Sequence, residues 1–71
     1  MSLKLLGISH LRVINAFEKA GFKVLRQGKH VVMRRGDVFI TIPRHNPVKR
    51  FTLEGIVKDS GLSMDEFIDY L

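Results

Sequence analysis

The sequence GFKVLRQGKHVVMRRGDVFITIPR occupies residues 21–44 and contains three short runs rich in β-branched residues. The runs cover residues 22–26, 30–35 and 38–42, and short segments with glycine separate them. Runs of this length and composition, with turn residues between them, are typical of strands joined by hairpins. The stretch therefore predicts a three-stranded antiparallel meander.

The segments between the runs are short enough to be tight turns. Gln27-Gly28-Lys29 joins the first two runs. Gly36-Asp37 joins the second and third, and a two-residue loop that begins with glycine suits a type II′ or similar turn. Pro43 has no backbone N–H for a strand ladder, so the third strand should end there.

A helix is predicted before the sheet. The hydroxyl of Ser9 can accept a hydrogen bond from the first turn and so cap the helix. Apolar residues then recur at helical spacing, at Leu11, Ile14, Phe17 and Ala20. Gly21 can adopt the positive φ that often follows a helix. We therefore expect a helix over residues 9–20.

Two further helices are predicted after a connector that follows Pro43. We expect Thr52 to cap a helix that runs to Ser60 and is ended by Gly61. Ser63 and Glu66 have the spacing of a capping box, which predicts a last helix to the end of the chain.

These elements give the order α-β-β-β-α, with the final α split in two. We predict an α+β fold, a two-layer sandwich with a three-stranded antiparallel sheet and helices on one face. Residues 9–71 are expected to form a single domain. Residues 1–8 are expected to be a poorly ordered N-terminal segment, in part of cloning origin.

Side-chain alternation along the second strand predicts which residues the helices cover. Val31 and Met33 point to one side, whereas His30 and Arg34 point to the other. We expect the first pair to face the helices and the second pair to share the open face of the sheet. The side chains assigned to the core, in preference to base stacking, include Val31, Met33, Phe39 and Phe67.

Composition removes several classes of function. The chain has 71 residues and no cysteine, which excludes thiol catalysis and cysteine-based zinc sites and fits a cytoplasmic protein. His10, His30 and His45 lack the spacing of a metal-ligand set, so we expect no metal and no cofactor. A glycine-rich nucleotide-binding loop is also missing from the sequence.

Charge is distributed unevenly along the chain. Residues 23–50 contain eight basic residues and a single acid, Asp37, whereas residues 51–71 contain five acids and one lysine. Such asymmetry favours a polyanionic partner for the basic part over an ordinary solvated surface. RNA is one such partner, and an acidic protein is another.

His30 is the best candidate for chemistry, although a histidine at the start of a strand is more often only a surface residue. An imidazole can act as general acid or base near neutral pH, and RNA carries its own nucleophile, the 2′-hydroxyl. Nearby cations can bind phosphate and stabilise the extra charge of the transition state. The candidates for this role are Lys29, Arg26, Arg34 and Arg44. His45 is either a further phosphate contact or a turn-stabilising side chain, and His10 is assigned a structural role.

The order of these motifs resembles that of HicA-type toxins. The resemblance covers about residues 9–71 and rests on a set of short segments in sequence. These are Ala20-Gly21-Phe22, Gly28-Lys29-His30, Thr41-Ile42-Pro43-Arg44-His45, Thr52-Leu53 and Gly61-Leu62-Ser63. The family implies a fold like the double-stranded RNA-binding domain and a metal-free mRNA interferase activity. It also implies a cognate HicB-type antitoxin and a catalytic histidine, which falls on His30.

The chain departs from the family at Lys29, where a serine is common. A lysine ammonium can bind phosphate, so the change is compatible with activity, although it could also displace a substrate-positioning hydroxyl. We therefore predict an endoribonuclease toxin. The alternative is an RNA-binding module without catalysis, because double-stranded RNA-binding domains work by shape and phosphate contacts.

Overall fold

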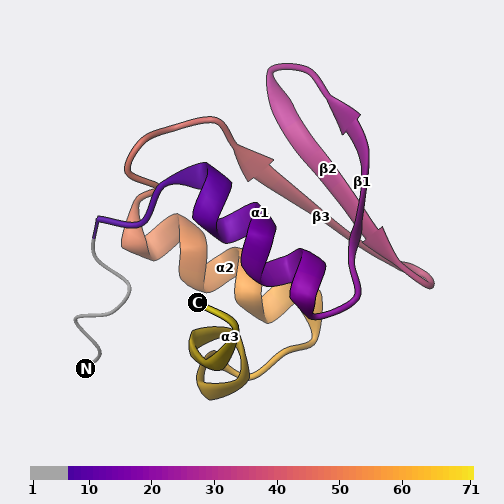
Figure 1. The fold of residues 1–71 in the computed structure, drawn as a ribbon. Coiled ribbons are helices and arrows are strands. Elements are labelled where there is room, and N and C mark those ends of the chain that lie inside the picture. The colour runs from indigo at the N-terminus through magenta and orange to yellow at the C-terminus, as the bar shows by residue number, and fades with distance from the viewer. Residues whose placement is uncertain (1–6) are drawn as a thin grey trace.

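The computed structural model describes residues 7–71. In it two helices cover one face of a three-stranded sheet, and a third helix packs against those two (Figure 1). This arrangement confirms the predicted α+β fold. Of the N-terminal segment predicted over residues 1–8, residues 1–6 lie outside the described residues. The elements are α1 His10–Lys19, β1 Lys23–Gln27, β2 His30–Arg35, β3 Val38–Pro43, α2 Arg50–Ser60 and α3 Met64–Tyr70.

The sheet is an antiparallel meander in the order β1-β2-β3. Val31 lies opposite Ile42 and Met33 lies opposite Ile40, and all four side chains are buried. The prediction that Val31 and Met33 face the helices is therefore confirmed. Because side chains alternate along a strand, the residues between them face away from the helices.

A bulge interrupts the ladder between β1 and β2. Val24 lies opposite Met33, but the next pair along is Arg26 with Val32. Leu25 is therefore the extra residue, and its side chain is 53% exposed. The bulge shifts the alternation along β1 by one residue, so that Arg26 lies on the open face with Val32 although Val24 lies opposite the buried Met33.

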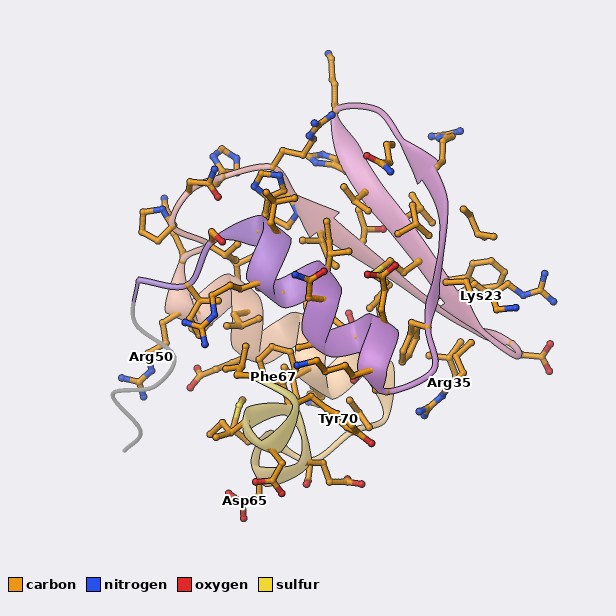
Figure 2. The ribbon with its side chains drawn as sticks, in the orientation of Figure 1. Lys23, Arg35, Arg50, Asp65, Phe67 and Tyr70 are labelled. Carbon is orange, nitrogen blue, oxygen red and sulfur yellow. The ribbon has the colours of Figure 1, made fainter. Side chains whose placement is uncertain are left out.

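The core is organised around Phe17 of α1, which is fully buried. Its ring meets the Phe22 ring edge-on at 5.5 Å between centroids and the Phe67 ring at 5.0 Å. Phe22 precedes β1 and Phe67 belongs to α3, which Figure 2 shows below α1. One side chain thus joins α1, α3 and the start of the sheet.

Two predicted details are wrong. Phe39 was assigned to the core but is 56% exposed, because Ile40 and Ile42 take the helix-facing positions of β3. Thr52 does not cap α2, which begins at Arg50 with Lys49 as its N-cap.

The early start of α2 follows from how the connector is anchored. Val48 is buried, and its N–H donates to the carbonyl of Ile8 at 2.8 Å. The chain is therefore fixed just before Lys49, whose carbonyl accepts from the Leu53 N–H at 2.9 Å. Ile8 is itself part of the core, although it precedes the predicted start of the domain.

The other predicted helix ends are confirmed. The Ser9 hydroxyl accepts a hydrogen bond from the Arg12 N–H at 3.3 Å. Gly61 adopts a φ of 84° after α2.

Among residues 7–71, none of the helices has the length and apolar character needed to span a membrane.

The predicted capping box holds the start of α3. The Glu66 N–H donates to the Ser63 hydroxyl at 3.1 Å, and the Glu66 carboxylate accepts from the Ser63 N–H at 2.9 Å. The Ser63 N–H that donates to the carboxylate is the main cause of a lowered pKa for Glu66, the Ser63 side chain lowers this pKa further, and the charge of Arg35 adds a small effect.

We expect acid to weaken the anchoring of α3 through this carboxyl group. A lowered folded-state pKa means that the stabilisation is present above the unfolded pKa and is lost as pH falls through the folded value. Glu66→Gln keeps an acceptor for the Ser63 N–H but cannot titrate. Urea unfolding at neutral and strongly acidic pH should show a smaller loss of stability for Glu66→Gln than for the wild type. Identical losses in the two proteins would contradict this account.

Candidate functional site

The face of the sheet turned away from the helices, called the open face below, carries basic and apolar side chains in rows across the strands. In one row Arg34 lies between Lys23 and Phe39. In the next, Val32 lies between Arg26 and Thr41, and His30 lies opposite Pro43 beyond it. His30 and Arg34 thus lie on the same face, as predicted.

His30 lies at one end of this face, in a turn formed by residues 28–30, called the His30 turn below. The Gly28 N–H donates to the carbonyl of His30 at 3.1 Å and closes the turn. The side chains of Lys29 and His30 are both exposed. A phosphate could therefore reach the imidazole and the ammonium together.

Arg44 is attached to the same turn from the end of β3. Its Nη1 donates to the carbonyl of Gly28 at 3.0 Å, across 16 residues of sequence. This contact follows from the pairing of His30 with Pro43, which brings the next residue of the chain beside the turn. The remaining N–H groups of the guanidinium can still bind a phosphate.

Arg26 is the third cation near His30. It lies opposite Val32, which makes it a diagonal neighbour of His30 on the open face. Diagonal neighbours in an antiparallel pair are about 7–8 Å apart, within reach of a long side chain. By strand register Arg26 and Arg44 thus lie at the His30 end of the sheet, and Lys29 directly precedes His30 in the chain.

Arg34 lies at the other end of the open face. It lies four positions after His30, which corresponds to roughly 13 Å along a strand. Its Nε donates to the carbonyl of Gly36 at 2.7 Å, and its guanidinium stacks over the Phe39 ring at 5.5 Å. Arg34 is thus directed to the β2–β3 turn and away from His30.

The two other histidines lie outside this cluster. His45 is exposed in the connector after β3 and lines a shallow hollow of about 220 Å³ with Pro43, Lys49 and Thr52. His10 contacts Asn46, whose side-chain oxygen lies 2.8 Å from the ring Nδ1 and 2.9 Å from the backbone nitrogen. This bond ties α1 to the connector and gives His10 the expected structural role.

Few of the basic side chains are neutralised by acids. Within residues 7–71, the one ion pair joins Arg50 to Glu54 along α2 at 3.4 Å. Figure 2 shows Asp65 projecting from α3 away from the sheet, whereas Lys23 projects from the sheet itself. The acids of α3 therefore leave the positive charge of the sheet uncompensated.

Metal binding finds no support in the described part of the chain. Its His, Asp and Glu side chains form no group of three or more that could hold an ion.

Sequence reasoning missed two features of this face. The first is the bond from Arg44 to Gly28, which depends on where β3 ends. The second is the row of Lys23, Arg34 and Phe39, which requires the strand register. The predicted hairpin lengths give an approximate register and could have placed Phe39 beside Arg34.

Fold and charge together define a small α+β protein with an exposed basic sheet and a histidine at the end of one strand. A family model for the HicA toxin of bacterial toxin–antitoxin systems matches residues 12–62, and the chain belongs to this family. The match includes the His30 turn and Arg44 and ends before α3. Searches of curated proteins and of solved structures gave no significant match.

We expect Arg44→Gln to loosen the His30 turn. The variant loses the guanidinium donor to Gly28, and one hydrogen bond is worth about 0.5–1.5 kcal/mol. Amide hydrogen exchange should be faster at Gly28 than in the wild type. Arg26→Gln is the matched control, because it removes the same charge from the neighbourhood without a bond to Gly28. Equal protection of Gly28 in all three proteins would contradict a holding role for Arg44.

Proposed function

We propose that this HicA-family protein is a metal-independent endoribonuclease that cleaves mRNA and is neutralised by a HicB-type antitoxin. The observation that carries the proposal is the exposed His30 turn, where Arg44 is bonded to Gly28 and Arg26 is a diagonal neighbour. An exposed imidazole at the same end of the sheet as cations that form no ion pair among residues 7–71 is suited to bind and cleave a phosphodiester. The site of action would be the cytoplasm, where mRNA is found.

The proposed reaction uses the nucleophile of the substrate. The 2′-hydroxyl attacks the adjacent phosphorus and loses its proton, the bond to the 5′ oxygen breaks, and that oxygen gains a proton. The products are a 2′,3′-cyclic phosphate and a 5′-hydroxyl. His30 would serve as general base for the first proton or general acid for the second.

The cations would stabilise the phosphate as its negative charge increases. Lys29 precedes His30 directly, so its ammonium can contact a non-bridging oxygen of the scissile phosphate. Arg44 offers a planar fork of donors that is partly fixed by its bond to Gly28. In this proposal Lys29 takes over substrate positioning from the serine that is common in the family.

The second candidate function is RNA binding without cleavage. The layout of one helix, three strands and further helices is compatible with a double-stranded RNA-binding fold. The unpaired cations of the open face support binding whether or not His30 is catalytic. The two candidates differ in what the loss of the imidazole should do.

We expect His30→Ala to abolish cleavage and to leave RNA affinity within about twofold of the wild type. The imidazole moves protons, whereas the cations supply most of the binding free energy. Both proteins would be incubated with a long mRNA in EDTA, and the 3′ ends of the products would be analysed. Lys58→Gln, on the exposed side of α2, is the control and should cut normally.

Cyclic phosphate ends produced by the wild type and Lys58→Gln, and not by His30→Ala, would support the enzyme. Cleavage by His30→Ala would remove the imidazole from the mechanism. RNA binding by every protein with cleavage by none would leave the binding module as the function.

RNA affinity should fall steeply with salt under either candidate. Contacts to about four phosphates of a single strand give a slope near −3 in a plot of log affinity against log salt concentration. Fluorescence anisotropy with a labelled 2′-O-methyl oligoribonucleotide measures the slope without cleavage. A flat salt response would contradict both nucleic-acid functions.

A further inference from the structure

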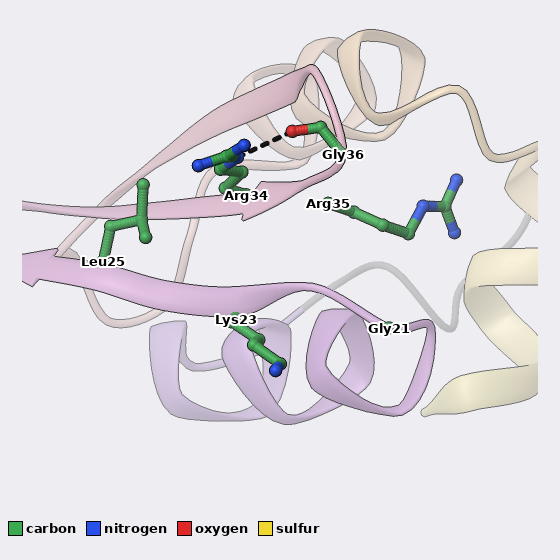
Figure 3. A pocket seen from close by; sticks show the side chains of 6 residues that line it. All are labelled: Gly21, Lys23, Leu25, Arg34, Arg35 and Gly36. Carbon is green, nitrogen blue, oxygen red and sulfur yellow. Dashed lines mark hydrogen bonds between the residues drawn. The ribbon is translucent and has the colours of Figure 1, made fainter.

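A second basic site lies at the end of the open face opposite the His30 turn. A hollow of about 310 Å³ is bordered by the start of β1 and by the β2–β3 hairpin (Figure 3). Two of its cations, Lys23 and Arg34, belong to one row of the sheet. The residues that line it are Gly21, Lys23, Leu25, Arg34, Arg35 and Gly36.

Arg34 is held in place with its charge unneutralised. Its Nε donates to the Gly36 carbonyl at 2.7 Å, and its guanidinium stacks on Phe39 (Figure 3 shows the hydrogen bond). Neither contact supplies a negative charge. The terminal nitrogens keep further N–H donors, and the planar fork matches the geometry of a phosphate.

Lys23 adds a second unneutralised charge directly opposite Arg34. Its side chain is exposed and forms no ion pair with any acid among residues 7–71, nor does Asp37 of the neighbouring turn pair with either cation. Two cations on neighbouring strands, with no acid paired to either, leave a local positive charge that attracts an anion.

Exposed apolar groups lie beside the two cations. Phe39 continues the same row and is 56% exposed, and Leu25 is presented by the bulge. Cations that track a backbone, with an aromatic ring for a base, are the combination used to bind single strands. A base paired in a duplex could not reach the ring, so the pattern favours an unpaired strand.

We infer that this hollow is a second phosphate subsite, in which Lys23 and Arg34 bind the backbone of a single-stranded RNA whose nearby base contacts Phe39. The inference rests on the proposed function, because it supplies the distal anchor for a strand that is cut at the His30 turn. The anchor lies roughly 13 Å from His30, so only a substrate long enough to span the open face can use it.

The predicted consequence is a dependence of cleavage on substrate length. A dinucleotide reaches the His30 turn alone, whereas a dodecanucleotide also reaches Lys23 and Arg34. Binding energy from a remote part of a substrate can accelerate its cleavage. The wild type should therefore cut the dodecanucleotide with a higher kcat/KM than the dinucleotide.

The test compares the double variant Lys23→Gln/Arg34→Gln with the control Lys19→Gln/Lys58→Gln, which removes two exposed charges from the helices. The first should lower kcat/KM on the dodecanucleotide about tenfold, because bonds to a charged group are lost, and leave the dinucleotide unaffected. The control should change neither. Lys23→Gln alone, which breaks no hydrogen bond or ion pair among residues 7–71, should give a smaller loss of the same kind.

A binding measurement separates this inference from the proposed catalysis. With a 2′-O-methyl dodecanucleotide, the double variant should bind more weakly and lose about 1.4 from the magnitude of the salt slope. This result would support the subsite even if the wild type cuts no RNA. Unchanged RNA affinity and cleavage, with or without loss of binding to an acidic protein partner, would overturn the subsite and leave the proposed catalysis standing.

Discussion

The packing of Phe17 against Phe22 and Phe67 is the interaction on which the rest of the structure depends. These three rings join α1, the start of β1 and α3 within a chain of 71 residues. A chain of this size has room for one core, and each aromatic pair adds about 0.5–1.5 kcal/mol beyond the area that it buries. With the core on the helix side, the other face of the sheet is left for binding.

The strand alternation converts this packing into a functional surface. Burial of Val31 and Met33 places His30 and Arg34 on the open face, because neighbouring side chains point in opposite directions. The side chain of Arg35 points to the helix side of the sheet, as those of Val31 and Met33 do, and it closes the edge between the sheet and the helices. Its Nη1 donates to the Ala20 carbonyl at 2.8 Å, and its guanidinium lies 4.9 Å from the Phe22 ring.

Gly21 allows this closure. It has a φ of 102°, and a Cβ there would approach the Arg35 side chain to 3.3 Å. A side chain at this position would therefore strain the backbone and displace the arginine.

Much of the fold could be predicted because its signals are local. The capping box at Ser63 and the turn at Gly36 depend on residues only a few positions apart. The start of α2 could not, because Lys49 carries no capping side chain and the position is fixed by the bond from Val48 to Ile8.

For the candidate site too, some features could be predicted from the sequence and others could not. The position of His30 in a turn before the second strand could be predicted from the sequence, as could the presence of basic residues near it. The end of the sheet at which each cation lies was not, since the bulge at Leu25 and the register decide it. Arg34 was grouped with His30 because strand alternation places both side chains on the same face. Its hydrogen bond to the Gly36 carbonyl instead directs it to the β2–β3 hairpin.

The central claim is that RNA lies along the open face, from the His30 turn to Lys23. The most direct measurement is an amide NMR titration of the protein with a 2′-O-methyl dodecanucleotide. The account predicts that the resonances of β1, β2, β3 and the His30 turn shift, whereas those of α3 stay in place. Shifts confined to the helices, with the strands unaffected, would contradict it.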